Sequence, residues 1–74
     1  MQFPDRKTVE RIRAEYPAGT KVILEHMEDP QAPPIGTAGV VLGVDDAGSL
    51  MVSWQNGSGL NVVYGEDRVR KAVD

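Results

Sequence analysis

The sequence predicts a small, mainly β domain that begins with one helix. Two features of the 74-residue chain lead to this fold class. Apolar residues recur at helical spacing near the N-terminus, and short β-branched runs bounded by Gly, Asp, Asn or Ser follow them. A chain of this length buries only about 60% of the surface of its unfolded state. We therefore expect one domain over residues 1–74, with the helix at about residues 5–15 and the β part at about residues 20–73.

The predicted helix has a start signal and one narrow apolar stripe. Asp5 is a good N-cap residue because its carboxylate can accept a hydrogen bond from a backbone N–H of the first turn. Val9, Ile12 and Tyr16 follow at positions i, i+3 and i+7, which places them on one face. A helix this short is not stable alone in water. Its stripe must therefore dock on the β part, together with Phe3.

Five strands are predicted after the helix. The first, residues 21–26, is followed by a long loop that contains Pro30, Pro33 and Pro34. Short turns separate the next three runs, and about one helical turn precedes the last. These runs span residues 39–45, 49–54, 60–64 and 68–73.

The first short turn is predicted from the requirement that apolar residues share one face. A three-residue loop of Asp46, Ala47 and Gly48, with Gly48 in the left-handed conformation, puts the alternate apolar residues of the two flanking strands on the same face of the sheet. It sets Val44 opposite Leu50, Leu42 opposite Val52, and Val40 opposite Trp54.

The second short turn follows the same logic. A two-residue turn at Asn56 and Gly57 would put the apolar sets of residues 50–54 and 60–64 on opposite faces, because a one-residue slip flips every side chain. We therefore expect a three- or five-residue connection, with Gly57 or Gly59 at a positive φ. The sets are Leu50, Val52 and Trp54 on one strand, and Leu60, Val62 and Tyr64 on the next.

A meander of short strands needs closure to hide its edges. The order of strands and connections is that of an SH3-like barrel, so we expect a five-stranded SH3-like barrel with the helix docked on it. The expected core comprises Val22, Leu24, Val44, Val52, Trp54, Leu60 and Val62.

No constellation of catalytic residues is evident. His26 is the only histidine, and Ser49, Ser53 and Ser58 lie in or beside turns without a nucleophile motif. Three acidic pairs lack calcium-loop spacing and are typical of turns, although the last two would share one end of a meander, which leaves a weak cation site as the alternative. The pairs are Glu28 with Asp29, Asp45 with Asp46, and Glu66 with Asp67. We expect no enzyme, no metal and no cofactor.

The segment PQAP, residues 30–33, has the PxxP pattern of ligands for SH3 domains. Inside a long loop of a small domain, the favoured interpretation is that its prolines stiffen the loop and lower the entropy lost on folding.

Charge is distributed unevenly along the chain. The net charge is −3, whereas a non-specific nucleic-acid binder is usually basic. Basic residues nevertheless gather at both ends, where they form either an ordinary solvated surface or a face that binds phosphate or an acidic protein. The candidate binding face comprises Arg6, Arg11, Arg13, Arg68, Arg70 and Lys71.

Composition excludes several other classes of protein. The chain has no cysteine, so it has neither a disulfide framework nor a thiolate metal site. No apolar run approaches the ~20 residues of a membrane span, and the N-terminus lacks the apolar core of a secretory signal. We expect a cytoplasmic protein with no membrane partner.

Several segments carry a family resemblance. They are YPAGT, MEDPQAPPIGTAG, GVDDAGS, W-QNGS-L and GEDR. In this order they resemble the domain-of-unknown-function family 4314, whose members are small proteins of phages and integrative conjugative elements, mostly of Firmicutes. Gln55 and Tyr64 depart from the family pattern, which commonly has an acidic residue and a proline there. The resemblance implies an accessory function on a mobile element, and the family has no known catalytic residues.

The resemblance also bears on the strand at residues 39–45. It implies that Val41, rather than Val40 and Leu42, faces the core, with Gly43 as a bulge. Simple alternation predicts the opposite, and the sequence leaves both arrangements open.

These features favour a non-enzymatic module that binds an unidentified protein. The alternative is a nucleic-acid-binding accessory protein that uses the basic face. The sequence leaves open whether the chain is a monomer or a homodimer.

Overall fold

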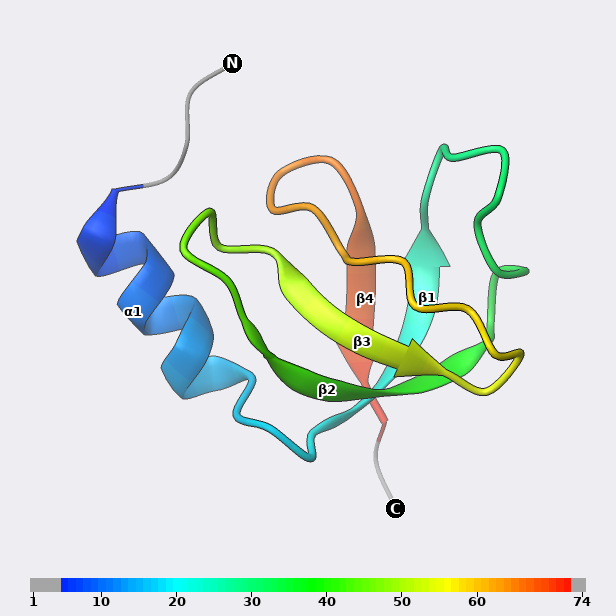
Figure 1. The fold of residues 1–74 in the computed structure, drawn as a ribbon, viewed down its shortest axis with the longest axis horizontal. Helices are drawn as coiled ribbons and strands as arrows, with labels where there is room; N and C mark the ends of the chain where they lie inside the picture. Colours follow the sequence, from blue (N-terminus) through cyan, green and yellow to red (C-terminus); the bar gives the residue numbers. More distant parts are fainter. Residues whose placement is uncertain (1–4, 73–74) are drawn as a thin grey trace.

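The computed structural model describes residues 5–72 and places one helix beside a four-stranded antiparallel sheet (Figure 1). The sheet order is β3-β2-β1-β4. No helix in this part of the chain is long and apolar enough to cross a membrane. The elements are α1 (Arg6–Glu15), β1 (Lys21–His26), β2 (Ala38–Val44), β3 (Leu50–Trp54) and β4 (Arg68–Lys71).

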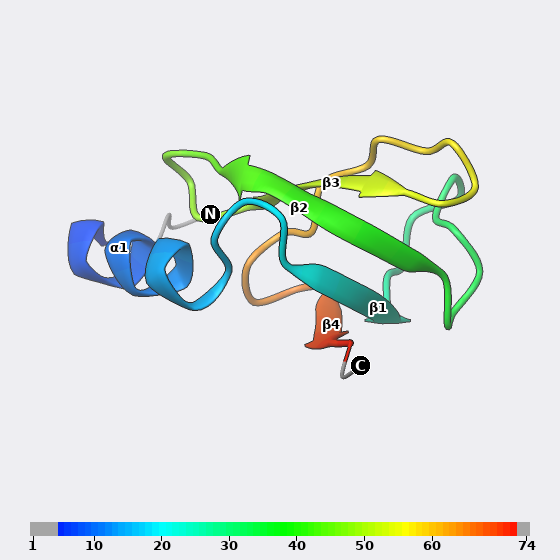
Figure 2. The ribbon, with the colours of Figure 1, turned by 90° about the horizontal axis from the view of Figure 1, so that it is seen from below.

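The helix begins and docks as its sequence predicts. The backbone N–H of Thr8 donates to Oδ1 of Asp5 over 2.8 Å, so Asp5 is the N-cap. Val9 and Ile12 are buried, and Tyr16 packs against the core. Figure 2 shows α1 beside one end of the sheet rather than across a face of it. The predicted contribution of Phe3 lies outside the described residues.

The N-cap makes stability depend on pH. The Thr8 side chain and then its backbone N–H donate to the Asp5 carboxylate and hold its pKa below the ordinary value of 3.8. A lowered pKa in the folded state contributes stability above the unfolded-state pKa, and this contribution is lost as the pH falls through the folded-state pKa. The free energies of unfolding of the wild type and of Asp5→Asn, measured with urea, should therefore begin to converge as the pH falls below about 4, and should differ least below the folded-state pKa. A difference that stays constant down to the lowest pH would contradict this role.

The turn between β2 and β3 has the predicted length. The N–H of Asp45 donates to the carbonyl of Ser49 over 3.0 Å, which encloses a three-residue loop. Gly48 has a φ of 82°, and Oδ1 of Asp45 accepts from the N–H groups of Ala47 and Ser49. Val44 consequently lies opposite Leu50, as predicted.

The remainder of the predicted β2–β3 pairing is wrong. The register shifts between Val41 and Gly43, so Val41 lies opposite Val52 and Gly39 opposite Trp54. The extra residue of this β-bulge reverses the facing of every residue that precedes it in β2. Val41 is therefore fully buried, whereas Val40 and Leu42 are exposed, which is the arrangement that the family resemblance implied.

The turn after β3 also has three residues, as expected. The N–H of Trp54 donates to the carbonyl of Ser58 over 3.0 Å, and Gly57 has a φ of 90°. Beyond it, Leu50 and Val62 form a single bridge with two bonds of 2.9 Å. Residues 58–62 therefore follow β3 in the predicted register without forming a strand.

The five-stranded SH3-like barrel is not confirmed for residues 5–72, because the sheet has four strands and is not closed. The backbone pairing between β3 and residues 58–62 is interrupted at Leu60. Its carbonyl accepts from the indole Nε1–H of Trp54 over 2.9 Å, and its N–H donates to Oγ of Ser58 over 3.3 Å. Hydrogen bonds to side chains thus replace the backbone hydrogen bonds that Leu60 would make with β3 in a fifth strand.

The core contains most of its predicted members. Of the expected residues, Leu60 is only half-buried, and Tyr64, which shares its predicted face, is exposed. Both follow from the missing fifth strand, since only a paired strand holds alternate residues inward. The buried apolar residues are Val9, Ile12, Val22, Leu24, Val41, Val44, Leu50, Val52, Trp54 and Val62.

The loop between β1 and β2 is anchored at Pro33. Pro33 is buried while Pro30 is exposed. The two prolines of the PxxP pattern are therefore not presented together, which favours the interpretation that they stiffen the loop.

Candidate interaction site

A groove of about 410 Å³ lies between the end of α1, the start of β3 and residues 62–69. Its floor is formed by apolar side chains that also belong to, or pack against, the core. These are Ile12, Leu50, Val62 and Val69. The floor of the groove is therefore made of side chains that the fold already holds in place.

Both tyrosines of the chain line this groove. Tyr16 is positioned by the end of α1, where its N–H donates to the carbonyl of Ile12 over 2.8 Å. Tyr64 precedes Gly65, whose φ of 84° turns the chain sharply. Asp67 closes that turn by accepting from the N–H of Val63 at 2.8 Å. Tyr64 is left 53% exposed, so its ring is available for contact.

Three charged residues, Glu15, Asp67 and Arg68, also line the groove. Burial raises the pKa of the Tyr16 phenol above its ordinary value of 10.0, and the carboxylates of Glu15 and Glu25 raise it further. The ammonium of Lys71 lies 5.2 Å from the centre of the Tyr16 ring, within cation–π range. The groove therefore combines aromatic and apolar side chains with charged groups.

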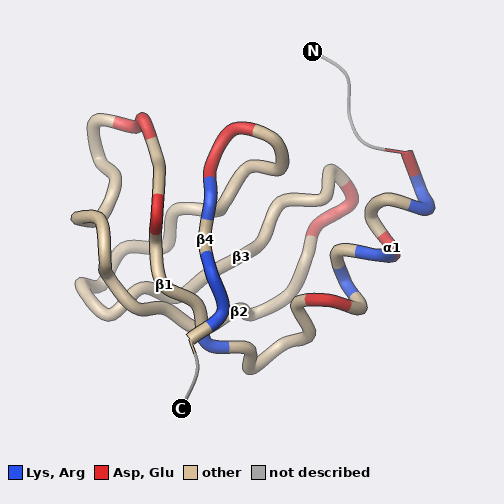
Figure 3. The backbone as a smooth tube through the Cα atoms, turned by 180° about the vertical axis from the view of Figure 1, so that it is seen from behind, with Lys and Arg blue, Asp and Glu red and all other residues tan. Residues whose placement is uncertain are grey.

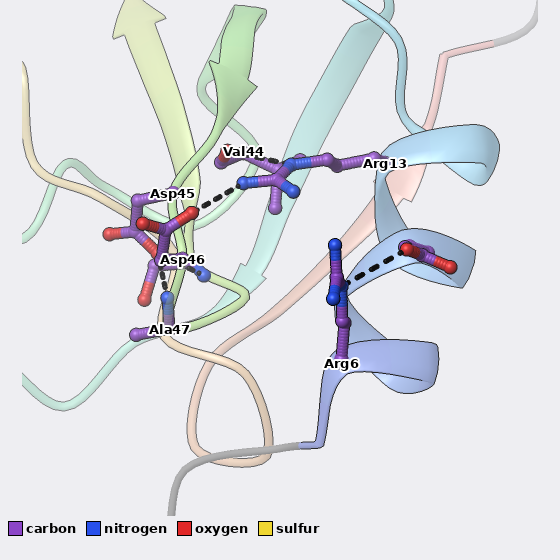
Figure 4. Close-up of polar contacts among 8 residues, drawn as sticks. Arg6, Arg13, Val44, Asp45, Asp46 and Ala47 are labelled. Atoms are coloured by element: carbon purple, nitrogen blue, oxygen red, sulfur yellow. Dashed lines mark hydrogen bonds and ion pairs between the residues drawn. The ribbon is translucent and has the colours of Figure 1, made fainter.

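The helical part of the predicted basic face is engaged with acidic groups. Arg13 donates from Nε to the carbonyl of Val44 over 3.2 Å and from Nη2 to Asp46 over 2.9 Å, tying α1 to the β2–β3 turn (Figure 4). Arg6 lies 3.6 Å from Glu10. Arg11, also exposed, lowers the pKa of the Asp5 carboxyl.

The strand part of the predicted basic face lies apart from the helix. Figure 3 shows the basic positions of β4 and those of α1 as two separate groups. Arg70 lies 3.8 Å from Glu25, Lys71 lies over Tyr16, and Arg68 lines the tyrosine groove. The structure therefore does not bring the six predicted residues together on one surface.

The other polar candidates form no catalytic constellation among residues 5–72. His26 has Glu28 as an ionic neighbour at 3.9 Å, and no described hydrogen bond joins it to a serine. A second cleft, of about 440 Å³, is lined by two of the acidic pairs. No group of three or more residues that could hold a metal ion occurs in the described part of the chain. The pairs in the cleft are Glu28 with Asp29 and Glu66 with Asp67.

Sequence reasoning missed the tyrosine groove, although two signals pointed to it. Tyr16 is the last member of the helical stripe and therefore lies at its open end. For Tyr64, the following Gly65 marks a turn, and a residue next to a turn is often exposed.

The structure is that of a small, mainly β protein with a groove that both tyrosines line. Its sequence matches the family described as Domain of unknown function (DUF4314) over residues 5–72. The chain belongs to that family, which confirms the resemblance seen in the sequence. No curated protein matches the chain, and no solved structure matches it.

Proposed function

We propose that this protein is a non-enzymatic interaction module of a phage or another mobile element, and that its tyrosine groove receives a segment of a partner protein. The groove carries this proposal, because it combines an apolar floor with the side chains of Tyr16 and Tyr64. Tyrosine is enriched where proteins bind each other, since its ring is apolar and its hydroxyl remains able to hydrogen-bond. The phage or mobile-element origin is supported by the sequence resemblance alone.

The proposal retains an SH3-like arrangement of the chain. Two features support it: the sheet order β3-β2-β1-β4 and the course of residues 58–62 alongside β3. In this arrangement the Leu50–Val62 bridge stands in place of a fifth strand. The groove lies just beyond that bridge, where the chain turns toward β4.

Removing the exposed tyrosine should abolish most of the binding. Peptides selected from a random library on the wild-type protein are expected to bind Tyr64→Ala about tenfold more weakly or worse, because truncating an aromatic anchor commonly costs more than 1 kcal/mol. Affinities are measured by isothermal titration calorimetry. Ile35→Ala is the matched control, since Ile35 is also an exposed apolar residue but lies outside the groove.

Two outcomes would count against the groove. One is the failure of any peptide to enrich on the folded wild-type protein. The other is an equal loss of affinity in the Tyr64 and Ile35 variants, which would place the binding surface elsewhere.

Nucleic-acid binding is the second candidate, and one observation favours it. Arg68 and Arg70 lie on one face of β4, and Lys21 lies beside the end of β4, where its carbonyl accepts from the N–H of Ala72 over 2.9 Å. This group could follow a phosphate backbone. Fluorescence titration with short single- and double-stranded DNA and RNA at two salt concentrations tests it. Binding that weakens steeply with salt supports this function, and its absence at low salt excludes it.

A further inference from the structure

The strand β4 forms an open edge of the sheet. It pairs with β1 on one side, and no other strand of residues 5–72 lies on its second side. The opposite edge, β3, is partly covered, because Leu50 and Trp54 bond to the segment of residues 58–62. An open edge presents backbone N–H and C=O groups with which a further strand can pair.

The pairing with β1 shows which backbone groups of β4 are available. The N–H of Ala72 donates to the carbonyl of Lys21 over 2.9 Å, so Ala72 bonds toward β1. Because the bonding direction alternates along an antiparallel strand, Arg70 also bonds toward β1. The N–H and C=O groups of Val69 and Lys71 therefore point away from β1, toward the open side.

The tyrosine groove reaches this edge of the sheet. Arg68 and Val69 of β4 line it together with the two tyrosines, whereas no residue of β1 lines it. Val69 also packs against the core, so β4 supplies the groove with an apolar side chain between Arg68 and Arg70. A segment that lies along β4 can therefore bond to the backbone of the edge and bury alternate side chains in the groove.

The charge of β4 indicates the chemistry of such a segment. Three of the four residues of the strand are basic (Figure 3). Arg70 lies 3.8 Å from Glu25, which is the one ion pair that β4 makes within residues 5–72. Lys71 lies over the ring of Tyr16, which is a neutral partner. The edge therefore keeps a net positive charge.

Positive charge makes the edge selective. It hinders pairing with a second copy of β4, since like charges would lie opposite one another, whereas carboxylates opposite these cations stabilise a strand pair. Directly opposite residues share a face, so a residue opposite Val69 faces the groove, and residues opposite Arg68 and Arg70 face the other side. Given the function proposed for the groove, on which this inference rests, we propose that the partner segment binds as an added antiparallel strand on β4. Its residues alternate between apolar and acidic.

Hydrogen exchange of single amides, measured by NMR, tests the added strand. The probe is a peptide selected from the random library on the wild-type protein. Without peptide, Val69 and Lys71 should exchange quickly while Arg70 is protected. Saturating peptide should slow the exchange of Val69 and Lys71 about tenfold or more, because a new strand would bond their N–H groups. The selected peptides should carry acidic residues in alternation with apolar ones.

Lys71→Pro separates the backbone bond from the side chain. Proline lacks the N–H, and an edge strand tolerates it where that N–H faces outward. Lys71→Ala is the matched control, since it removes the same side chain and keeps the donor. The proline variant should bind the peptide about fivefold more weakly than the alanine variant, because one backbone hydrogen bond is lost. Circular dichroism establishes that both variants are folded.

The outcomes separate the added strand from the groove itself. Peptides that need Tyr64 but leave Val69 and Lys71 in fast exchange would overturn the added strand and leave the groove as the binding site. Equal affinities of the two Lys71 variants would also overturn it. Selected peptides without acidic residues, or salt-sensitive binding of short DNA or RNA in place of any peptide, would overturn the acidic partner. If no peptide enriches on the wild-type protein, the groove and the added strand are overturned together.

Discussion

Replacing Trp54 by alanine is expected to lower the free energy of unfolding by about 3–5 kcal/mol. Trp54 is 3% exposed and is the largest side chain in the core. It also holds residues 58–62 in place, because its indole N–H donates to the carbonyl of Leu60. The variant therefore loses both packing and the anchor of the segment beside β3. At roughly 0.05–0.15 kcal/mol per residue, a domain of this size has only about 4–11 kcal/mol of stability, so the variant should lose a large part of it.

Urea unfolding followed by far-UV circular dichroism measures this effect without relying on tryptophan fluorescence. Trp54→Phe separates the two contributions, since it keeps much of the apolar volume and removes the donor. We expect it to lose less stability than the alanine variant. A loss below about 1 kcal/mol for Trp54→Ala would show that the indole is not central to the core.

Adding one methyl group at Gly39 should have the second-largest effect. A Cβ there would lie 2.6 Å from Cγ1 of Val52 and 2.7 Å from Cε3 of Trp54. It would also come within 3.1 Å of the backbone carbonyl of Ser53, which cannot move without disturbing the β2–β3 ladder. Gly39→Ala should therefore cost about 3 kcal/mol through overpacking.

Gly59→Ala is the matched control for this substitution. A Cβ at Gly59 meets nothing within 4 Å, so the change should alter stability by less than about 1 kcal/mol. Thermal and urea unfolding of both variants give the comparison. Equal effects at the two glycines would contradict the close approach of β2 to the side chains of β3.

The features predicted well from sequence are those set by local chemistry. Asp5 caps the helix because a short acidic side chain can reach the N–H groups of the first turn. Gly48 and Gly57 adopt positive φ because three-residue turns need a left-handed residue. The odd number of residues in each turn then determines which strand residues face inward, as the Val44–Leu50 and Leu50–Val62 pairs show.

The features missed depend on a single residue that breaks a regular pattern. The bulge at Gly43 adds one residue to β2, and alternation alone does not show where an insertion falls. The fifth strand fails at Leu60, because its carbonyl binds a side chain from the neighbouring strand. Neither the bulge nor the loss of the fifth strand can be recognised from the alternation of apolar residues, although the family resemblance did point to the bulge.

The candidate site shows the same division between local and long-range information. The candidate binding face combines basic residues that are grouped by sequence position, but those of α1 and those of β4 form two separate groups in space. Tyr16 and Tyr64 are distant in sequence, and the groove joins them because the chain turns at Gly65. Which residues meet across a small domain depends on the register of the whole sheet.

Amide chemical-shift mapping with a library-selected peptide tests the proposed interaction groove most directly. The shifts should concentrate around the lining of the groove and leave the outward face of the sheet unchanged. The expected positions are Ile12, Tyr16, Leu50, Val62, Tyr64 and Val69. Shifts confined to β4 and Lys21, or no shifts at saturating peptide, would contradict the groove as the site of partner binding.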